Sequence, residues 1–445
     1  MMSELPSAPP SSPPTAAAST PPDRRRTIGV AFASWACASI EWYDFFIYGT
    51  AAALVFPQLF FPVTDSLTGT LLSFAAFGVA FVARPFGGAL FGHLGDTFGR
   101  KKSLITALVA MGVATTLIGL LPTYQVVGAA APVLLVLLRF LQGIAVGGQQ
   151  GGVILLATEN APARRRGFYS SFAAAGAPGG VLLANGAFLL VTTMMPHEAF
   201  VTWGWRIPFV ASFVLIVFAV GIQLRLEETA EFRATEKKTD RSRSPLFLAI
   251  RRHPRQILLA AGCYVAINIT YYVFITFIVA YTTNKAILGM AESAVLSAVM
   301  IASAVELFAL PLAGLLSDRF GRRTVFASGA VLLGLFCFAF WPLVDTGSVT
   351  LLTLALVVGL GLVHSLMYGP HGALFSEAFT TEVRYSSLSL GIQLANVLGG
   401  AFAPFIATAL LAGFGTSTSI AIYMAIGCAI GAISTTALRP VAPAH

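Results

Sequence analysis

Ionisable side chains inside apolar stretches are the residues of this sequence that could do chemistry. Glu41 and Asp44 lie in the first long apolar stretch, and together with Tyr48 they are spaced three and four residues apart. This spacing places all three on one face of a helix. A charge in hydrocarbon costs at least ~2.5–3.5 kcal/mol on insertion scales, so a carboxylate there is a candidate proton carrier. The alternative is a structural pair with an arginine.

Arg84 is the candidate group for binding an anion. It stands in the second apolar stretch, eight residues before Gly92, which is about 12 Å along a helix at 1.5 Å per residue. Its guanidinium stays charged and presents a planar fork of donors that matches a carboxylate, so an anionic substrate would supply the counter-charge. A permanent pair with Glu41 or Asp44, or a role in fixing the kink at Pro85, would explain the same residue.

Two further charged residues lie deep in apolar stretches. Glu306 stands eight residues before Gly314, the same spacing as Arg84 before its own glycine. It could carry a proton or pair with Arg139, which lies one helical turn from Gln142. Structural pairing would explain Arg139 equally well.

Polar and aromatic side chains recur at helical spacing in three other apolar stretches. They are Tyr264, Asn268, Tyr271 and Tyr272 in one, His364, Tyr368 and His371 in the next, and Gln393 and Asn396 in the last. A histidine titrates near neutral pH and could assist proton transfer, or it could simply pack against its neighbours. The tyrosines and amides suit a flat or hydroxylated organic acid, although such groups also hydrogen-bond between membrane helices.

Composition indicates that most of the chain faces lipid. Of its 445 residues, 56% are hydrophobic and only 10% are charged, whereas about a quarter of the residues in soluble proteins are charged. The four cysteines lie in apolar runs without metal-ligand spacing, and no acidic cluster suggests a metal. We therefore expect neither a metal nor a cofactor, and no catalytic residue.

Twelve apolar stretches are long enough to cross about 30 Å of hydrocarbon. They are placed at 28–56, 67–91, 103–121, 132–156, 168–193, 205–224, 256–283, 291–315, 324–344, 349–374, 385–411 and 416–437. The sequence therefore predicts an all-α membrane protein with twelve transmembrane helices.

The basic residues predict the orientation of these helices. If the N-terminus is cytoplasmic, all 27 Lys and Arg residues except Arg84, Arg139, Arg206 and Lys285 fall in cytoplasmic segments. This is the asymmetry of the positive-inside rule. The pI of 9.5 then reflects topology and not nucleic-acid binding, which needs a basic face on a soluble domain.

A ten-residue pattern occurs twice in the chain. Residues 92–101 are GHLGDTFGRK and residues 314–323 are GLLSDRFGRR, with Gly, Asp, Gly and Arg in register. Glu159 precedes Arg166 by seven residues, and Glu377 precedes Arg384 by seven. The chain thus consists of two similar halves. Two repeated halves with a solute site between them at mid-membrane are the architecture of many transporters.

The repeat and the composition divide the chain into five parts. We expect a disordered cytoplasmic tail at 1–27, a six-helix bundle at 28–224, a charged cytoplasmic linker at 225–255, a second six-helix bundle at 256–438 and a short tail at 439–445.

The repeated loops are candidates for a gate on the cytoplasmic side. Asp96 with Arg100, and Asp318 with Arg322, would clamp helix ends in the outward-open state. Glu159, Arg166, Glu377 and Arg384 would be further members of this gate. The alternative is a solvated turn whose basic residues only obey the charge rule.

The repeated pattern resembles the G-x-L-x-D-x-x-G-R-[KR] signature of the major facilitator superfamily, and RFLQG at 139–143 resembles the R-x-x-Q-G motif of its fourth helix. Within that superfamily, EWYDF at 41–45, RPFGG at 84–88, WRIPF at 205–209 and EVRY at 382–385 resemble the metabolite:proton symporters. The resemblance runs from about residue 28 to 437. It implies two pseudo-symmetric six-helix bundles and a role in coupling for Arg139.

Two positions depart from the pattern of this family. The family usually has glutamate where Gln149 stands, so a role in proton coupling does not carry over to that position. His371 stands where glutamine is more usual.

The function expected from these features is import of a small organic acid with protons by alternating access. The acid is a mono- or dicarboxylate, or a shikimate-like or aromatic acid, and the transporter is a monomer in the bacterial inner membrane with both termini in the cytoplasm. A symporter of betaine or proline and an exporter of drugs or metabolites are the alternatives. An intramembrane enzyme would need a nucleophile–base pair or a metal cluster at one depth, and the sequence offers neither.

Overall fold

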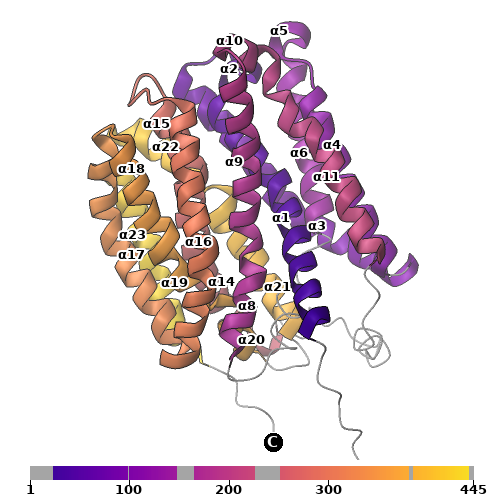
Figure 1. Cartoon of the computed structure of the whole chain (residues 1–445), viewed down its shortest axis with the longest axis vertical. Coiled ribbons are helices and arrows are strands. Elements are labelled where there is room, and N and C mark those ends of the chain that lie inside the picture. The colour runs from indigo at the N-terminus through magenta and orange to yellow at the C-terminus, as the bar shows by residue number, and fades with distance from the viewer. Residues whose placement is uncertain (1–23, 99, 148–164, 226–250, 380–383, 440–445) are drawn as a thin grey trace, which may run out of the picture.

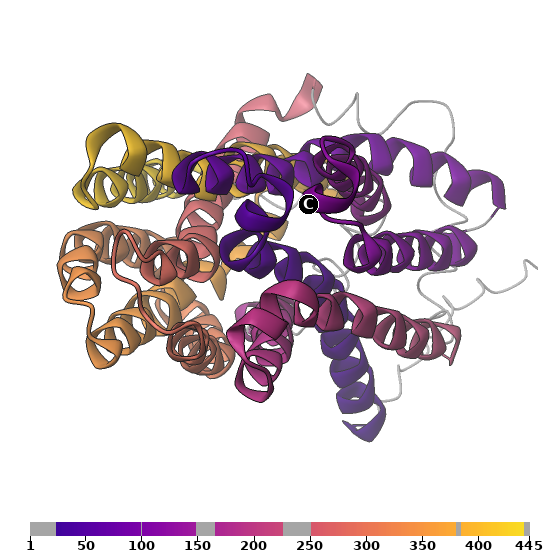
Figure 2. The same cartoon turned by 90° about the horizontal axis from the view of Figure 1, so that it is seen from above.

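The computed structural model describes residues 24–98, 100–147, 165–225, 251–379 and 384–439, and every regular element in these ranges is a helix. The helices form two bundles that lie side by side (Figure 1). The view from above shows the N-terminal elements, in indigo to magenta, on one side and the C-terminal elements, in orange to yellow, on the other (Figure 2).

The N-terminal bundle contains six long helical spans. Its helices are α1 (Arg24–Leu54), the short α2 (Phe56–Phe60), α3 (Ser66–Phe98), α4 (Arg100–Leu120), the short α5 (Tyr124–Val127), α6 (Ala130–Gly147), the consecutive α8 (Arg166–Ala174) and α9 (Gly176–Met194), the short α10 (His197–Ala199), the π-helical η2 (Phe200–Gly204) and α11 (Arg206–Arg225).

The C-terminal bundle repeats this plan with three spans that contain π-helical segments. Its helices are α14 (Pro254–Tyr272), η3 (Val273–Phe277) and α15 (Ile278–Thr283), then α16 (Glu292–Phe320) and α17 (Arg322–Asp345), then α18 (Val349–Leu356), η4 (Val357–His364), α19 (Ser365–Tyr368) and α20 (His371–Glu377), then α21 (Arg384–Ala395), η5 (Asn396–Ala401) and α22 (Ala403–Phe414), and finally α23 (Thr418–Ala437).

Twelve spans cross the molecule, as the sequence predicted. Ten helical stretches of the described residues are long and apolar enough to cross a membrane, and an eleventh is the pair His197–Gly204 and Arg206–Gly221, which is bent by 50°. The first span is α1, whose 31 residues give a length of about 46 Å. The chain is therefore a multi-pass membrane protein.

The repeated ten-residue patterns lie mostly in helix, contrary to the prediction of two loops. Helix α3 continues to Phe98 and α16 continues to Phe320, so the aspartates of both patterns stand on the last turns of long helices. The turn itself is short because Gly321, at φ 94°, is the C-cap of α16 and α17 begins at the next residue. We call the end of the bundles where α3 meets α4 and α16 meets α17 the motif end.

Glycines bring helix backbones together where polar side chains must be positioned. A Cβ added at Gly143 of α6 would clash with the carbonyl oxygen of Ala80, and one at Gly147 would clash with that of Arg84. Helices α3 and α6 are therefore in backbone contact, the close approach that small residues allow in membranes. This contact fixes the helix that carries Arg84 against the helix that carries Arg139.

Candidate functional site

Arg84 is buried at the centre of the molecule between aromatic rings. Its guanidinium carbon lies 4.7 Å from the ring centroid of Phe45 and 4.3 Å from that of Phe81. Nε and Nη1 have no hydrogen-bond partner, and none of the ion pairs between described residues involves Arg84. A permanent pair with Glu41 or Asp44 is therefore not formed, and two donors remain for another acceptor.

Arg139 is also buried, but most of its donors are used within the N-terminal bundle. Nη1 donates to Oε1 of Gln142 at 2.5 Å, and Nη2 donates to the carbonyl oxygen of Phe77 at 3.1 Å. The guanidinium carbon lies 3.8 Å from the ring centroid of Tyr48. The ring of Tyr48 is therefore covered by this arginine, and Arg139 stabilises the bundle.

Asp44 lies inside the N-terminal bundle, against α11. Its Oδ1 accepts a hydrogen bond from the hydroxyl of Ser212, whereas Oδ2 has no partner among the described residues. Gln142 joins this network because its Nε2 donates to the Thr115 hydroxyl at 2.8 Å and to the backbone carbonyl of Asp44 at 3.3 Å. Glu41 is only partly buried and lies within electrostatic reach of Arg84.

Glu306 pairs with a histidine in the C-terminal bundle and not with Arg139. Its Oε1 lies 2.9 Å from Nδ1 of His364, and both side chains are fully buried. Nε2 of His364 lies 3.3 Å from the carbonyl oxygen of Ile267, and the ring of Tyr271 stacks on His364 at 5.3 Å between centroids. Oε2 of Glu306 has no hydrogen-bond partner in the part of the chain that the structure describes.

The tyrosines and amides named from the sequence split into two groups. Asn268 donates to Oδ1 of Asn396 at 3.0 Å, and Asn396 donates to Oε1 of Gln393 at 3.4 Å, so these amides join α14 to the span of α21 and η5. Tyr271 and Tyr272 instead reach the boundary between the bundles. There Tyr271 lies 6.0 Å from Phe46, and Tyr272 lies 6.4 Å from Phe45, between ring centroids.

His371 belongs to the C-terminal bundle's own packing. Its Nδ1 is hydrogen-bonded to the carbonyl oxygen of Tyr368, and its ring stacks on that of Tyr368 at 4.9 Å. The ring of Tyr264 lies 5.5 Å away. Among the described residues, His364 contacts a carboxylate and His371 does not.

The second repeat of the ten-residue pattern connects the two bundles at the motif end. Asp318 accepts hydrogen bonds from the backbone N–H groups of Gly167 at 2.9 Å and Phe168 at 3.0 Å, which are the first residues of α8 after Arg166. A helix N-terminus favours a carboxylate because its first N–H groups have no partner within the helix. A Cβ added at Gly314 would lie 2.6 Å from the carbonyl oxygen of Gly167, so the two backbones also touch.

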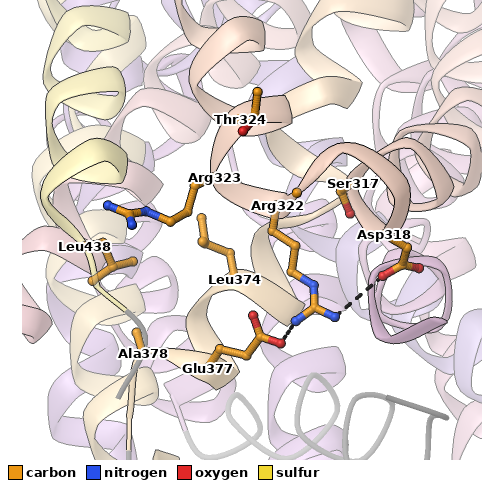
Figure 3. A pocket seen from close by; sticks show the side chains of 10 residues that line it. Ser317, Asp318, Arg322, Arg323, Thr324, Leu374, Glu377, Ala378 and Leu438 are labelled. Carbon is orange, nitrogen blue, oxygen red and sulfur yellow. Dashed lines mark ion pairs between the residues drawn. The ribbon is translucent and has the colours of Figure 1, made fainter. Parts of the chain in front are cut away.

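Arg322 ties this junction to the end of α20. It lies between Asp318, with Nη2 3.5 Å from Oδ1, and Glu377, with which it also forms an ion pair (Figure 3). The three side chains line a pocket of about 410 Å³ at the motif end, away from the buried centre. Arg384 donates to the carbonyl oxygen of Phe379 at 3.3 Å.

Several predicted site residues lie outside the described part of the chain. Glu159 and Gln149 belong to residues 148–164, which the structure does not describe. Asp96 and Arg100 stand on α3 and α4, but their side chains lie outside the described part. The first copy of the predicted gate therefore stays a prediction.

Sequence reasoning missed partners that are small or apolar. Ser212 and Ser303 are single hydroxyls in apolar spans, and Phe45 and Phe81 look like ordinary packing residues until their rings are seen on Arg84. A serine inside an apolar span was a usable signal, because buried hydroxyls need partners. The π-helical segments, which recur at functional sites, left no clear pattern in the sequence.

Two bundles of membrane-spanning helices, repeated in sequence and enclosing buried charges at their boundary, define a secondary transporter. Residues 30–248 match the family model described as "Sugar (and other) transporter", and residues 263–445 match "Major Facilitator Superfamily". The chain belongs to the major facilitator superfamily, and it is a transporter and not an enzyme.

The relatives cover nearly the whole chain. It is 42% identical over 399 residues to the Inner membrane metabolite transport protein YhjE of Escherichia coli, covering 89% of this chain and 90% of the relative. It is 38% identical over 412 residues to the Shikimate transporter of Escherichia coli, covering 92% and 94%. The Proline/betaine transporter of Salmonella typhimurium is 32% identical over 416 residues, covering 91% and 82%.

The solved structures establish the fold. A crystal structure of a D-xylose–proton symporter superposes with a TM-score of 0.70 at 20% sequence identity, covering 93% of this chain and 97% of that one. The chain therefore has the twelve-helix major facilitator fold with two pseudo-symmetric bundles.

Proposed function

We propose that the protein imports a small organic acid together with protons across the bacterial inner membrane by alternating access. The observation that carries this proposal is the buried guanidinium of Arg84, whose Nε and Nη1 have no hydrogen-bond partner in the described ranges of the chain. A substrate carboxylate would accept from one of these donors and would neutralise the charge. Hydrogen bonds to charged groups contribute roughly 1.5–3 kcal/mol, enough to make this one contact decisive for affinity.

The aromatic rings around Arg84 favour a ligand that supplies charge and not only hydrogen bonds. Phe45 and Phe81 exclude water from the guanidinium and offer it only the faces of their rings. A buried cation is costly unless it is paired. An anion entering from the boundary between the bundles would remove that cost.

The proposed proton carriers are Glu41 and Asp44 on α1. Oδ2 of Asp44 has no hydrogen-bond partner among the described residues, so it can take a proton without losing a hydrogen bond, and Ser212 holds the other oxygen. Glu41 is near enough to Arg84 to interact with it electrostatically. Binding of a substrate anion at Arg84 would therefore change the field at Glu41, which is the linkage that symport requires.

Contacts between the bundles at both ends support alternating access. At the motif end Asp318 holds the start of α8. At the opposite end the amide of Asn284 donates to the hydroxyl of Ser66 at 3.4 Å, and His197 lies 3.6 Å from Glu292. Opening the molecule at either end requires breaking the contacts between the bundles at that end. The distribution of basic residues supports a cytoplasmic motif end and cytoplasmic termini.

Uptake into proteoliposomes tests the proposal. The purified chain would be given an inward proton gradient and screened against monocarboxylates, dicarboxylates, tricarboxylates, shikimate, aromatic acids, proline and betaine. We expect gradient-dependent accumulation of at least one acid, lost when the gradient is collapsed. Accumulation of none of the acids would overturn the proposal.

A proline or betaine symporter is the second candidate. The four tyrosine rings of Tyr264, Tyr271, Tyr272 and Tyr368 lie next to one another, and aromatic faces attract quaternary ammonium groups. Betaine accumulation without uptake of any acid would favour this candidate.

A further inference from the structure

Three buried polar groups around His364 in the C-terminal bundle have no hydrogen-bond partner among the described residues. They are Oε2 of Glu306, the hydroxyl of Ser303 and the hydroxyl of Tyr271. Ser303 stands one turn before Glu306 on α16, and Tyr271 interacts electrostatically with Glu306 while its ring covers His364. Buried polar groups are normally satisfied, so three unsatisfied ones at one place indicate a site for a polar ligand.

The hydrogen bonds of His364 determine what Glu306 offers to that ligand. A carbonyl oxygen only accepts, so Nε2 of His364, which faces that of Ile267, carries a hydrogen. One further proton lies between Nδ1 and Oε1 of Glu306, on either atom. In both arrangements the pair has no net charge, and Oε2 remains a hydrogen-bond acceptor. The Glu306–His364 pair therefore presents an open acceptor without net charge and does not call for a cation.

A chain of aromatic contacts joins this site to Arg84. Arg84 lies against Phe45, and the ring of Phe45 is 6.4 Å from that of Tyr272. Tyr272 is 6.1 Å from Tyr271, which covers His364. The contact between Phe45 and Tyr272 crosses from one bundle to the other, so a ligand between the two sites would part the bundles at these rings.

We propose that Glu306, Ser303 and Tyr271 form a second subsite that binds a hydroxyl group of the substrate, while Arg84 binds its carboxylate. This inference rests on the proposed function and narrows it to hydroxylated carboxylic acids. A hydroxyl donates to Oε2 of Glu306 and accepts from Tyr271 or Ser303, so it satisfies the carboxylate oxygen and one of the two hydroxyls that the protein leaves open. A quaternary ammonium has no hydrogen to donate and leaves Oε2 unsatisfied.

Calorimetric binding to the purified full-length chain in detergent tests the subsite with two pairs of acids. Shikimate is paired with cyclohex-1-ene-carboxylate, the same ring without hydroxyls, and malate is paired with succinate. We expect the hydroxylated member of at least one pair to bind about tenfold or more tightly than its partner. Tyr271→Phe and Ser303→Ala should each reduce this preference by about fivefold, the scale of one neutral hydrogen bond.

Tyr423→Phe is the matched control, because the hydroxyl of Tyr423 is also without a partner among the described residues but lies on α23, which carries no residue of the proposed subsite. It should leave the preference unchanged. The subsite is wrong if the wild-type chain shows no preference for the hydroxylated acids. It is also wrong if Tyr271→Phe and Ser303→Ala leave the preference intact, or if they lower the affinity for both acids of a pair equally. Binding of proline or betaine with none of the four acids would instead contradict the proposed function itself.

Discussion

Arg84 and Glu306 occupy the same position in the two repeats and have opposite charges. Each stands eight residues before the first glycine of its ten-residue pattern, one on α3 and the other on α16. Arg84 keeps two donors without partners, whereas Glu306 gives one oxygen to His364 and keeps the other free. The symmetric scaffold thus presents donors from one half and acceptors from the other.

This difference explains how a duplicated fold can bind an asymmetric molecule. The two long helices place their charged residues at equivalent depths, because both run to the motif end with the same spacing. The side chains around each charged residue then determine what it can bind. Aromatic rings isolate the arginine, and a histidine neutralises the glutamate without using up its acceptors.

The largest expected effect comes from the α1 carboxylates. Glu41→Gln or Asp44→Asn should abolish accumulation of substrate against its gradient but spare counterflow exchange at equal pH, because exchange needs the loaded carrier to reorient without net proton movement. Uptake and counterflow in proteoliposomes measure both quantities. If both variants still accumulate substrate, the proton carriers lie in the C-terminal bundle, and Glu306 or His364 is tested next.

Asp65→Asn is the control for this pair. Asp65 lies just before α3, where hydrogen bonds from the Thr68 side chain and backbone lower the pKa of its carboxyl. This group stays ionised throughout the pH range of transport assays and cannot carry protons. Its substitution should leave accumulation unchanged, and a loss there would mean that the assay reports damage to the fold.

The next effect separates the two buried arginines. Arg84→Lys keeps the charge but loses the planar fork, so it should weaken binding of the acid by ~1.5–3 kcal/mol, about 10- to 150-fold, with proton coupling intact. Arg139→Lys should instead lower the thermal stability of the ligand-free protein by ~1–2 kcal/mol, because a lysine cannot bond Gln142 and the Phe77 carbonyl together. Equal effects of the two variants on affinity would contradict this division.

A smaller effect is expected at the motif end. Asp318→Asn removes the charge that holds the N-terminus of α8 and partners Arg322, so it should slow transport several-fold while changing substrate affinity little. Stopped-flow uptake and equilibrium binding separate rate from affinity. Asp96→Asn, at the equivalent position of the first repeat, should act in the same direction. Equal losses of rate and affinity would count against a gate.

The sequence predicted the spans because the bilayer imposes a length and a polarity on each helix. Counting residues also placed Arg84 and Glu306 at equivalent positions, and both lie on long helices, α3 and α16, eight residues before the first glycine of each pattern. It could not predict that Glu306 pairs with His364 and not with Arg139. That choice depends on how α16 packs against η4, and side-chain spacing within one helix carries no information about it.

The ends of the repeated patterns show a second limit. Polar and glycine residues at 92–101 and 314–323 indicated loops, but most of these residues continue α3 and α16. At the end of α16, Asp318 accepts hydrogen bonds from the start of α8 in the other bundle. Local propensity yields here to a contact between segments far apart in the chain.

The smallest expected effect comes from comparing Glu306 with Asp345, a carboxylate whose two oxygens both have hydrogen-bond partners. Asp345 accepts from the hydroxyl of Tyr281 at 2.6 Å through one oxygen and from that of Ser417 at 2.6 Å through the other, so each of its oxygens already has a partner within the fold. Tyr281→Phe should therefore lower the free energy of unfolding by about 1 kcal/mol and leave transport unchanged. Tyr271→Phe, the same change beside Glu306, should leave thermal stability unchanged, because its hydroxyl has no partner to lose. Thermal unfolding of both variants in detergent measures the contrast, and a loss of stability in Tyr271→Phe equal to that in Tyr281→Phe would show that its hydroxyl already has a partner within the fold.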